Sequence, residues 1–191
     1  MIRYDLLHLR RSMEKYLDGE RFEHSLGVAY TAAALAMCHG ADVEKAQVAG
    51  ILHDCAKCVG HDKKLNLCRR HGIEVSDIER RNPFLLHTKV GSHVAKHQFD
   101  ISDEDILRAI CNHTTGRPAM SLLEKIIYIS DYIEPLRGHD RRLTEIRTEA
   151  FRGDIDRATL MKAEDVLKRL EDGGREIDPA TRETYAYYNN L

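Results

Sequence analysis

Apolar residues recur every three or four positions along most of this chain. Near the start, Leu6, Leu9, Met13 and Leu17 follow this spacing, which places side chains on one face of an α-helix. Sustained alternation of β-branched and polar residues, the pattern typical of strands, is missing. We therefore predict an all-α fold in a single domain. The expected helices cover residues 2–17, 21–38, 43–54, 62–71, 76–81, 88–98, 103–112, 121–134, 143–152, 156–172 and 179–189.

Residues that start and stop helices agree with this pattern. Gly40 is placed to end one helix, and Asp42 is placed to cap the next one. In the segment "SDED", Ser102 is the expected cap, with Asp105 three residues later in the first turn. The charged segment "RGHDRR", residues 137–142, is the best candidate for an exposed loop, and a charged, amphipathic C-terminal third follows it.

Length and charge restrict the classes of protein to which this chain can belong. Its 191 residues suffice for one domain with a sizeable core. With 29 Lys and Arg against 31 Asp and Glu, the net charge is −2, which gives no broad basic surface for nucleic acid or an anionic membrane. No apolar run reaches the roughly 20 residues of a membrane span, and the first residues lack the apolar core of a signal peptide. We expect a soluble, cytoplasmic protein without nucleic-acid or membrane partners.

The five cysteines are an odd number without a regular spacing, which indicates reduced thiols inside a cell. Cys55 and Cys58 form a Cys-x-x-Cys pair, a spacing that also occurs in zinc sites and redox motifs. A zinc site would need a second pair of ligands at a suitable distance, and a redox pair would need a βαβ setting. Because the sequence offers neither, it favours neither function.

The segment "GILHDCAK", residues 50–57, places His53 and Asp54 at the end of an apolar run. The same dipeptide occurs at 61–62 and 139–140, where glycine and charged neighbours indicate solvated turns or helix starts. Only the first copy follows a stretch that a protein would bury. This context, rather than the dipeptide itself, makes His53 and Asp54 candidates for chemistry.

Three further polar residues stand where a helical bundle would bury them. His24 shares a helical face with Val28 and Leu35. Asp131 lies in the apolar stretch "EKIIYISDYI", and His113 ends another apolar helix. Each residue alone is more simply interpreted as a hydrogen-bonded core histidine or a salt-bridged carboxylate. Together, imidazoles and carboxylates that need partners in one core suit a divalent transition metal.

The remaining histidines of interest lie on or beside the predicted helix 88–98. His93 and His97 are four residues apart and share a face, whereas His87 points about 120° away from His93. The segment "HVAKH" lacks the glutamate of the zinc-protease motif, so we interpret His93 and His97 as an exposed pair or as outer support for a site. His87 remains a candidate ligand.

The ordered set H…HD…H…H…D, formed by these candidates, resembles the HD-domain metal-dependent phosphohydrolases. The segments "FEHSLGVA", "GILHDCAK", "HTKVG", "NHTTGR" and "SDYIEPLR" are similar to the YqeK-like branch, the bacterial symmetrical diadenosine tetraphosphate hydrolases. These segments span residues 22–137, whereas residues 138–191 carry no motif that we can match. The resemblance implies an HD-domain helical bundle over 1–191, with its metal-site core at about 20–137 and helices of 143–191 packing on that core.

The resemblance also implies a site for two transition-metal ions. The first ion would be held by His24, His53, Asp54 and Asp131. The second would be held by His87 and His113, with Asp54 as the bridge. Iron is the metal that the family suggests, whereas the ligand set alone equally admits Mn, Co or Zn.

The activity implied by the resemblance is cleavage of diadenosine tetraphosphate to two ADP, by in-line attack of a metal-bridging hydroxide. Asp54 and Lys57 would then be catalytic. Lys57 follows Asp54 by three residues, so a helix that continues through it would direct its ammonium toward the site as a phosphate contact. Its alternative role is that of a helix-end lysine interacting with the helix dipole.

The other substrate contacts are expected from the turn that follows His113 and from Arg137. Thr115, Gly116 and Arg117 form this turn, in which backbone N–H groups and a guanidinium are suited to an anion. Arg117 and Arg137 are candidates for gripping the more distant phosphates, because a planar guanidinium matches two phosphate oxygens. Each arginine has the alternative of being an ordinary surface residue.

Other functions remain open at this stage. An HD phosphohydrolase could act on mononucleotides or (p)ppGpp, and a binding protein could keep the fold and metal as a non-catalytic nucleotide-binding regulator. A cyclic-dinucleotide phosphodiesterase is disfavoured, because no Gly-Tyr-Pro follows the His-Asp pair.

The C-terminal "TYAYYNNL" supplies aromatic area that closes the core or joins a dimer contact, with core closure favoured. We also expect a homodimer, since two-fold pairs are the commonest oligomers and the family resemblance points the same way.

Overall fold

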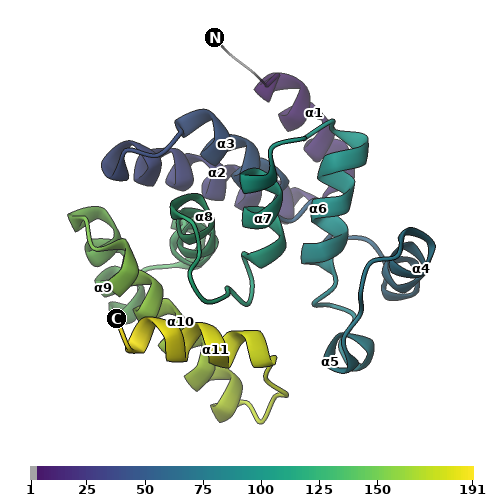
Figure 1. The fold of residues 1–191 in the computed structure, drawn as a ribbon. Helices are drawn as coiled ribbons and strands as arrows, with labels where there is room; N and C mark the ends of the chain where they lie inside the picture. Colours follow the sequence, from purple (N-terminus) through teal and green to yellow (C-terminus); the bar gives the residue numbers. More distant parts are fainter. Residues whose placement is uncertain (1–3) are drawn as a thin grey trace.

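The computed structural model describes residues 4–191, and over that range the chain is built from eleven α-helices and one short 3-10 helix (Figure 1). The helices are α1 Leu6–Tyr16, α2 Gly19–His39, α3 Val43–Leu52, α4 His61–His71, α5 Asp77–Arg81, α6 His87–Gln98, α7 Glu104–Asn112, α8 Leu122–Ile133, η1 Pro135–Arg137, α9 Arg141–Arg152, α10 Ile155–Asp172 and α11 Pro179–Asn189.

Each helix expected from the periodicity is present, and the all-α prediction is confirmed. The first one begins at Leu6 rather than at residue 2, and residues 1–3 of the chain lie outside the described range. The third ends at Leu52, two residues before its expected end, so the His-Asp pair lies in the turns that follow it. The sequence did not indicate η1.

The helix boundaries show which capping residues the sequence predicts correctly. Gly40 ends α2 in the left-handed conformation with φ +70°, and the Asp42 side chain accepts a hydrogen bond from the Lys45 N–H to open α3. The prediction that Ser102 caps α7 is wrong. Asp103 is the cap, because its carboxylate accepts hydrogen bonds from the N–H groups of Asp105 and Ile106, two of the unpaired donors of the first turn.

Helix α8 lies in the middle of the molecule (Figure 1) and packs against α2, α3, α7 and α10. Ile126, Ile127 and Ile129 are completely buried, and they cover three directions around the helix axis. A helix that is apolar around most of its circumference is stable only when neighbours surround it. This explains why α8 stands at the centre, and it means that Asp131 on this helix must face other side chains.

Helices α2 and α3 approach each other closely at Gly50. A Cβ atom at this position would lie only 2.6 Å from the Cα of Ala29, so no other residue fits without moving a helix backbone. The close approach brings together two polar residues that are distant in sequence. The rings of His24 on α2 and His53 after α3 are 5.2 Å apart, edge to face.

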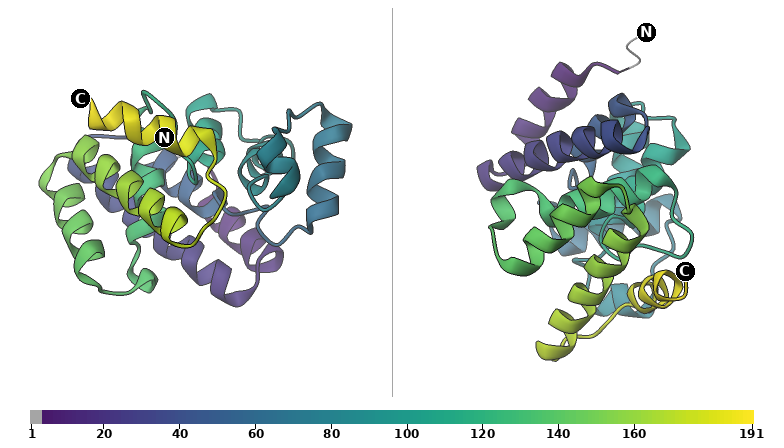
Figure 2. Two further views of the ribbon diagram at one scale, coloured as in Figure 1. Left: turned by 90° about the horizontal axis from the view of Figure 1, so that it is seen from below. Right: turned by 90° about the vertical axis from the view of Figure 1, so that its left-hand side faces the viewer.

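The last three helices lie along one side of this core, and α10 contacts α8 directly. Figure 2 shows α1 and α11 at opposite ends of the molecule, with α4 and α5 far from α9.

Tyr188 of α11 is 5% exposed, and its hydroxyl accepts a hydrogen bond from the Met120 N–H at 3.0 Å. The predicted closing of the core by the C-terminal tyrosines is therefore confirmed for Tyr188, whereas Tyr187 and Leu191 are exposed.

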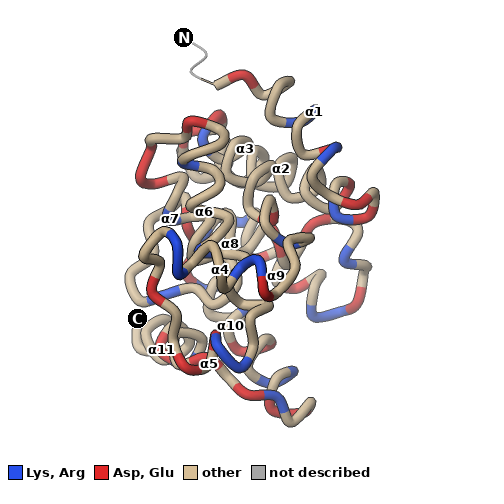
Figure 3. Tube along the Cα trace, turned by 90° about the vertical axis from the view of Figure 1, so that its right-hand side faces the viewer, with Lys and Arg blue, Asp and Glu red and all other residues tan. Residues whose placement is uncertain are grey.

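Acidic and basic residues are interspersed along the helices (Figure 3). The predicted loop 137–142 is mostly exposed, although its first residue belongs to η1 and its last two to α9. Within residues 4–191, no helix combines the length and the apolar character needed to cross a membrane.

Candidate metal centre

Five helices bring the six candidate ligands to one place. His24 comes from α2, and His53 and Asp54 come from the turn after α3. The other three ligands are His87 at the start of α6, His113 at the end of α7, and Asp131 on α8. All of them are buried except Asp131, which is partly buried. Segments separated by more than 100 residues therefore meet at one polar cluster inside an otherwise apolar core.

The two oxygens of Asp54 face two different groups of ligands. Oδ2 lies 3.7 Å from the Nε2 atom of His53. Oδ1 lies 3.4 Å from Nε2 of His87 and 3.5 Å from Nε2 of His113. On the far side of His53, the Oδ1 atom of Asp131 lies 3.0 Å from Nε2 of His24 and 3.8 Å from Nε2 of His53. Asp54 thus stands between the two halves of the cluster.

Each of the four imidazoles is oriented through its Nδ1 atom. His53, His87 and His113 each contact the backbone carbonyl oxygen three residues earlier, at distances of 2.8, 2.7 and 2.7 Å. A carbonyl only accepts hydrogen bonds, so Nδ1 carries the proton and donates it. In a neutral imidazole, Nε2 is then unprotonated and free to bind a metal, which is the arrangement that metal-binding histidines usually show.

His24 is oriented differently, by a buried carboxylate. Its Nδ1 atom lies 3.0 Å from Oε1 of Glu134, which is 1% exposed and also accepts a hydrogen bond from the Leu136 N–H. Gly27 makes room for this contact, because a Cβ atom there would lie 2.6 Å from Oε2 of Glu134. A carboxylate behind a ligand histidine fixes its tautomer and strengthens it as a donor to a metal.

Burial keeps two of the histidines neutral. It lowers the pKa of His53 to about 4, despite the opposing effect of the nearby Asp54 carboxylate. It also lowers the pKa of His87 well below its ordinary value, and the neighbouring His113 and Lys57 add to this shift. Both rings are therefore neutral at neutral pH, which is the form that binds a metal.

The two carboxylates of the cluster are ionised at neutral pH. Burial by itself would raise the pKa of Asp54, but His53, His113 and Lys57 around it hold that pKa well below the ordinary range. Burial would likewise raise the pKa of Asp131, and its hydrogen bond with His24 together with the nearby Lys162 holds it low. Neutral imidazoles and ionised carboxylates thus lie side by side.

The cluster fits divalent metal ions. The candidate ligands form two sets, and inside each set the ligand atoms all lie within 4.8 Å of one another. One set is His24, His53 and Asp131, and the other is His53, Asp54 and His113. Within residues 4–191, Nε2 of His53 and Oδ1 of Asp54 are buried and make no hydrogen bond. Buried polar atoms without hydrogen bonds are costly, and a metal ion would satisfy both. Nitrogen and carboxylate ligands in this number suit Fe, Mn, Co or Zn.

Three cationic side chains surround the cluster. Lys57 lies in a turn after α3 and not on a continuation of that helix. Its Nζ atom nevertheless lies 3.3 Å from Oδ1 of Asp54 and 3.0 Å from Nε2 of His87. Arg137 donates to Oδ1 of Asp131 at 2.7 Å, and Arg21 lies 3.5 Å from Oδ2 of Asp54.

The turn after His113 is held by contacts within the protein. Arg117 forms a bidentate ion pair with the buried Glu124, with 2.7 Å between Nε and Oε1 and 2.5 Å between Nη2 and Oε2. The Gly116 N–H donates to the Asn112 carbonyl, and the space beside its α-carbon is filled by Thr184 of α11, 2.7 Å from an ideal Cβ. Phosphate contacts by Arg117 or by the Gly116 N–H stay predictions, and each would require one of these bonds to break.

Thr115 and Thr114 have different surroundings in this turn. The Thr115 hydroxyl donates to the Gly116 carbonyl, and the backbone carbonyl of Thr115 accepts from the Thr184 hydroxyl at 3.0 Å. The Thr114 hydroxyl lies 3.2 Å from Nε2 of His87. Of the two threonines, Thr114 is therefore the one that contacts a candidate metal ligand.

Sequence reasoning missed Arg21, Glu134 and Lys162. Arg21 precedes His24 by three residues, and Glu134 follows Asp131 by three, so helical spacing could have indicated both. Lys162 lies at a core-facing position of α10, and its Nζ atom donates to the carbonyl oxygens of Tyr128 and His113, the latter at 3.3 Å. Burial lowers the pKa of Lys162 to about 7, with Asp131 opposing the shift.

The remaining candidate groups lie outside the centre. Cys55 is buried and donates to the Gly91 carbonyl, whereas Cys58 is exposed, and both thiols are free. The rings of His93 and His97 are 4.4 Å apart, as expected for residues on one helix face. A third ring, that of His71, lies 4.2 Å from His93.

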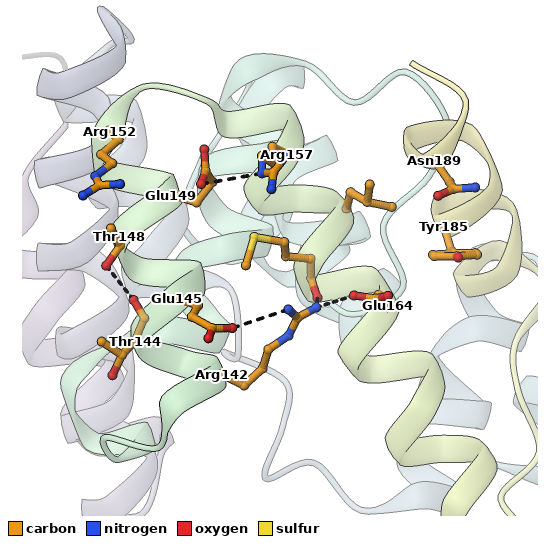
Figure 4. Close-up of a pocket in the computed structure, with 12 residues that line it drawn as sticks. Arg142, Thr144, Glu145, Thr148, Glu149, Arg152, Arg157, Glu164, Tyr185 and Asn189 are labelled. Atoms are coloured by element: carbon orange, nitrogen blue, oxygen red, sulfur yellow. Dashed lines mark hydrogen bonds and ion pairs between the residues drawn. The ribbon is translucent and has the colours of Figure 1, made fainter.

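A second charged concavity of about 560 Å³, here called the α9–α11 groove, lies between α9, α10 and α11 (Figure 4). Five of its six charged side chains form ion pairs with one another. Arg142 contacts Glu145 and Glu164, and Arg157 contacts Glu149. The groove contains none of the candidate ligands, and most of its charges are paired within it.

The HD domain family profile matches residues 21–136, which include all six candidate ligands, and the chain belongs to this family. It is 38% identical to the symmetrical bis(5'-nucleosyl)-tetraphosphatase of Halalkalibacterium halodurans and 36% identical to that of Bacillus subtilis, with 91% of each chain covered in both cases. A crystal structure of an HD superfamily hydrolase from Clostridium acetobutylicum, described as involved in NAD metabolism, matches with a TM-score of 0.93. It is 41% identical over 98% of both chains.

Proposed function

We propose that this protein hydrolyses diadenosine tetraphosphate symmetrically to two ADP. The observation that carries the proposal is the position of Asp54, whose two oxygens face the two halves of a buried ligand cluster. This geometry suits a carboxylate that bridges two ions, as in two-metal phosphohydrolases. The similarity to two symmetrical tetraphosphatases over nine-tenths of the chain supports the choice of substrate.

His24, His53, Asp54 and Asp131 would hold one ion, and His87 and His113 would hold the other together with Asp54. Divalent ions at these positions would lower the pKa of water and neutralise charge on phosphoryl oxygens. We infer that the metal is iron from the family resemblance, and the donor set is compatible with it.

Three side chains of this protein would hold the phosphates. Lys57 and Arg137 each contact a candidate ligand carboxylate, so phosphate oxygens at the metal centre would lie within their reach. Arg21 and Arg137 also line a cavity of about 540 Å³ that opens beside His24. A guanidinium matches two phosphate oxygens, and we assign the phosphates of one half of the substrate to this cavity.

In the proposed reaction, water attacks the second phosphorus from one end, and the other ADP leaves with the bridging oxygen. The position of the cut follows from the distance between the metal centre and the bound nucleoside, because the protein holds both in fixed positions. Cleavage between the second and third phosphates is then a property of the geometry of the site.

A homodimer and a cytoplasmic location complete the proposal. The homodimer is supported by the family resemblance and by the frequency of two-fold pairs among oligomers. The location is supported by five free cysteines, which are typical of reducing compartments. Light scattering at micromolar concentration tests the first, and a monomer mass would contradict it.

The deciding experiment separates this function from its alternatives. Purified protein reconstituted with iron or manganese is incubated with diadenosine tetraphosphate, mononucleotides and (p)ppGpp, and the products are separated by chromatography. In water enriched in oxygen-18, diadenosine tetraphosphate should give only ADP, with the label on the terminal phosphate of one of the two molecules. ATP plus AMP would contradict symmetrical cleavage, and binding without any product would indicate a regulator.

A further inference from the structure

A cavity of about 540 Å³ lies on the side of the metal centre where His87 and Thr114 are found, and we call it the Phe84 cavity. Its walls come from the segment before α6, the turn after α7, and the end of α10 with the start of α11. Its lining includes the side chains of Asn82, Phe84, Thr114, Val166, Leu170 and Glu176.

This cavity begins one side chain away from the metal ligands. The ring of Phe84 is 5.2 Å from the ring of His87, and Nζ of Lys57 lies 4.5 Å from the centre of the Phe84 ring. The same Nζ atom is 3.3 Å from Oδ1 of Asp54. A phosphate held by Lys57 at the centre would therefore lie one side chain away from the Phe84 cavity.

The lining of the cavity suits a flat aromatic group with a polar edge. Phe84 is 48% exposed, an unusual degree for a phenylalanine beside a buried site. Val166 and Leu170 of α10 add apolar lining, and Asn82, Thr114 and Glu176 add polar atoms. The volume lies within the range of small-molecule sites, and an aromatic side chain stacks on any base because every base has a π-face.

The C-terminal third of the chain builds one wall of this cavity. Glu176, in the connection between α10 and α11, forms a bidentate ion pair with Arg81 and accepts a hydrogen bond from the Asn82 amide at 3.0 Å. These contacts fix the α10–α11 connection against the segment that carries Phe84. Residues 138–191, for which the sequence offered no motif, thus complete a cavity next to the metal centre.

We propose that the Phe84 cavity is a nucleoside subsite, in which one base of the dinucleotide stacks on Phe84 while its phosphates extend past Lys57 to the metal centre. This assignment rests on the proposed function, which supplies the substrate. It also gives the site a means of counting phosphates, since the base is bound at one fixed point and the attacked phosphorus at another.

The test compares the variant Phe84→Leu with the control Phe151→Leu, which changes an exposed phenylalanine of α9 that lines neither cavity beside the centre. Inhibition constants are measured for ADP, which has a base, and for inorganic pyrophosphate, which has none. In the Phe84 variant we expect about a tenfold weaker ADP affinity and a similar rise in the KM for diadenosine tetraphosphate. Pyrophosphate inhibition and kcat should stay within about twofold, and the control should match the wild type throughout.

Equal weakening of ADP and pyrophosphate, or no change in either, would overturn the assignment. A second variant, Val166→Phe, places a larger side chain in the lining of the cavity from α10 and should weaken ADP more than pyrophosphate even if the Phe84 variant folds poorly. The proposed function fails in a different way, through the products of the wild-type enzyme. If these are not two molecules of ADP, the comparison of ADP with pyrophosphate still decides whether the cavity binds a nucleoside.

Discussion

The metal centre and the α9–α11 groove are both concave and both rich in charge, yet only one has the properties of a reactive site. In the groove, exposed arginines and glutamates form ion pairs with one another. In the candidate metal centre, two carboxylates are ionised beside neutral imidazoles, and two buried atoms of candidate ligands make no hydrogen bond within residues 4–191. The two regions therefore differ in the burial and pairing of their polar atoms rather than in the number of their charges.

The sharpest test of this difference is the removal of one carboxylate from each region. Asp54→Ala should reduce turnover on the order of 10³-fold or more and lower the metal content, because Asp54 faces both halves of the ligand cluster. Glu164→Ala in the groove should leave both properties unchanged. Steady-state kinetics and elemental analysis check these outcomes, and wild-type turnover in the Asp54 variant would contradict the site.

Acid should lower the free energy of unfolding of chelator-treated protein, because His53 is buried and neutral in the folded state. Its pKa is about 4 in the folded protein and about 6.5 in the unfolded chain. Between these values the unfolded chain binds the extra proton, so the free energy of unfolding falls as the pH is lowered from 6.5 to 4, by about 3 kcal/mol for this residue. Urea titrations at several pH values measure the slope.

The variant His53→Asn serves as the control for the acid effect. In this variant the free energy of unfolding should depend less steeply on pH, because the contribution of His53 is lost. The contribution of His87 remains and has the same sign, since the pKa of His87 is also lowered. An identical slope in the wild type and in this variant would show that His53 is not the buried neutral group described above.

Glu134→Gln tests whether the carboxylate behind His24 matters for metal affinity. The amide keeps the shape of the side chain but removes the charge that supports the imidazole, so we expect manganese affinity to fall about 10- to 100-fold. Glu145→Gln removes a comparable charge in the groove and should leave the affinity unchanged. Calorimetric titration with manganese provides the measurement, and equal affinities for the two variants would contradict this role.

The smallest effect is expected for Arg157→Ala in the groove. Arg157 is exposed and lies 3.6 Å from Glu149, and exposed pairs of this kind contribute little to stability. The free energy of unfolding should change by less than about 0.5 kcal/mol and turnover should not change. A loss of activity would show that the groove takes part in function, and the contrast between the two regions would then be wrong.

Much of this structure could be predicted from local patterns. The helices followed from apolar spacing, because each buries one face, and the six candidate ligands followed from polar residues in apolar stretches together with the resemblance to a family. Helix α3 ends early because His53 and the residues after it enter turns, as in the hydrogen bond from the Lys57 N–H to the Asp54 carbonyl. Apolar spacing does not record where such turns begin.

The contacts that the sequence did not reveal depend on packing between distant segments. Arg117 was expected to bind phosphate, but Glu124 in the first turn of the next helix is its partner. Lys162 and Glu176 reach the centre and its neighbouring cavity from the segment without motifs. Helical periodicity indicates which face of a helix is buried, but it does not indicate which other segment that face meets.

The contact between Gly27 and Glu134 also restricts how this protein can diverge in evolution. Any side chain at position 27 would occupy the space of the carboxylate that supports His24, since even a Cβ atom would lie 2.6 Å from Oε2. A shorter acid at position 134 would relieve the clash but would withdraw from the imidazole. A substitution at position 27 therefore acts on His24 indirectly, because the Glu134 carboxylate must move to make room for the new side chain.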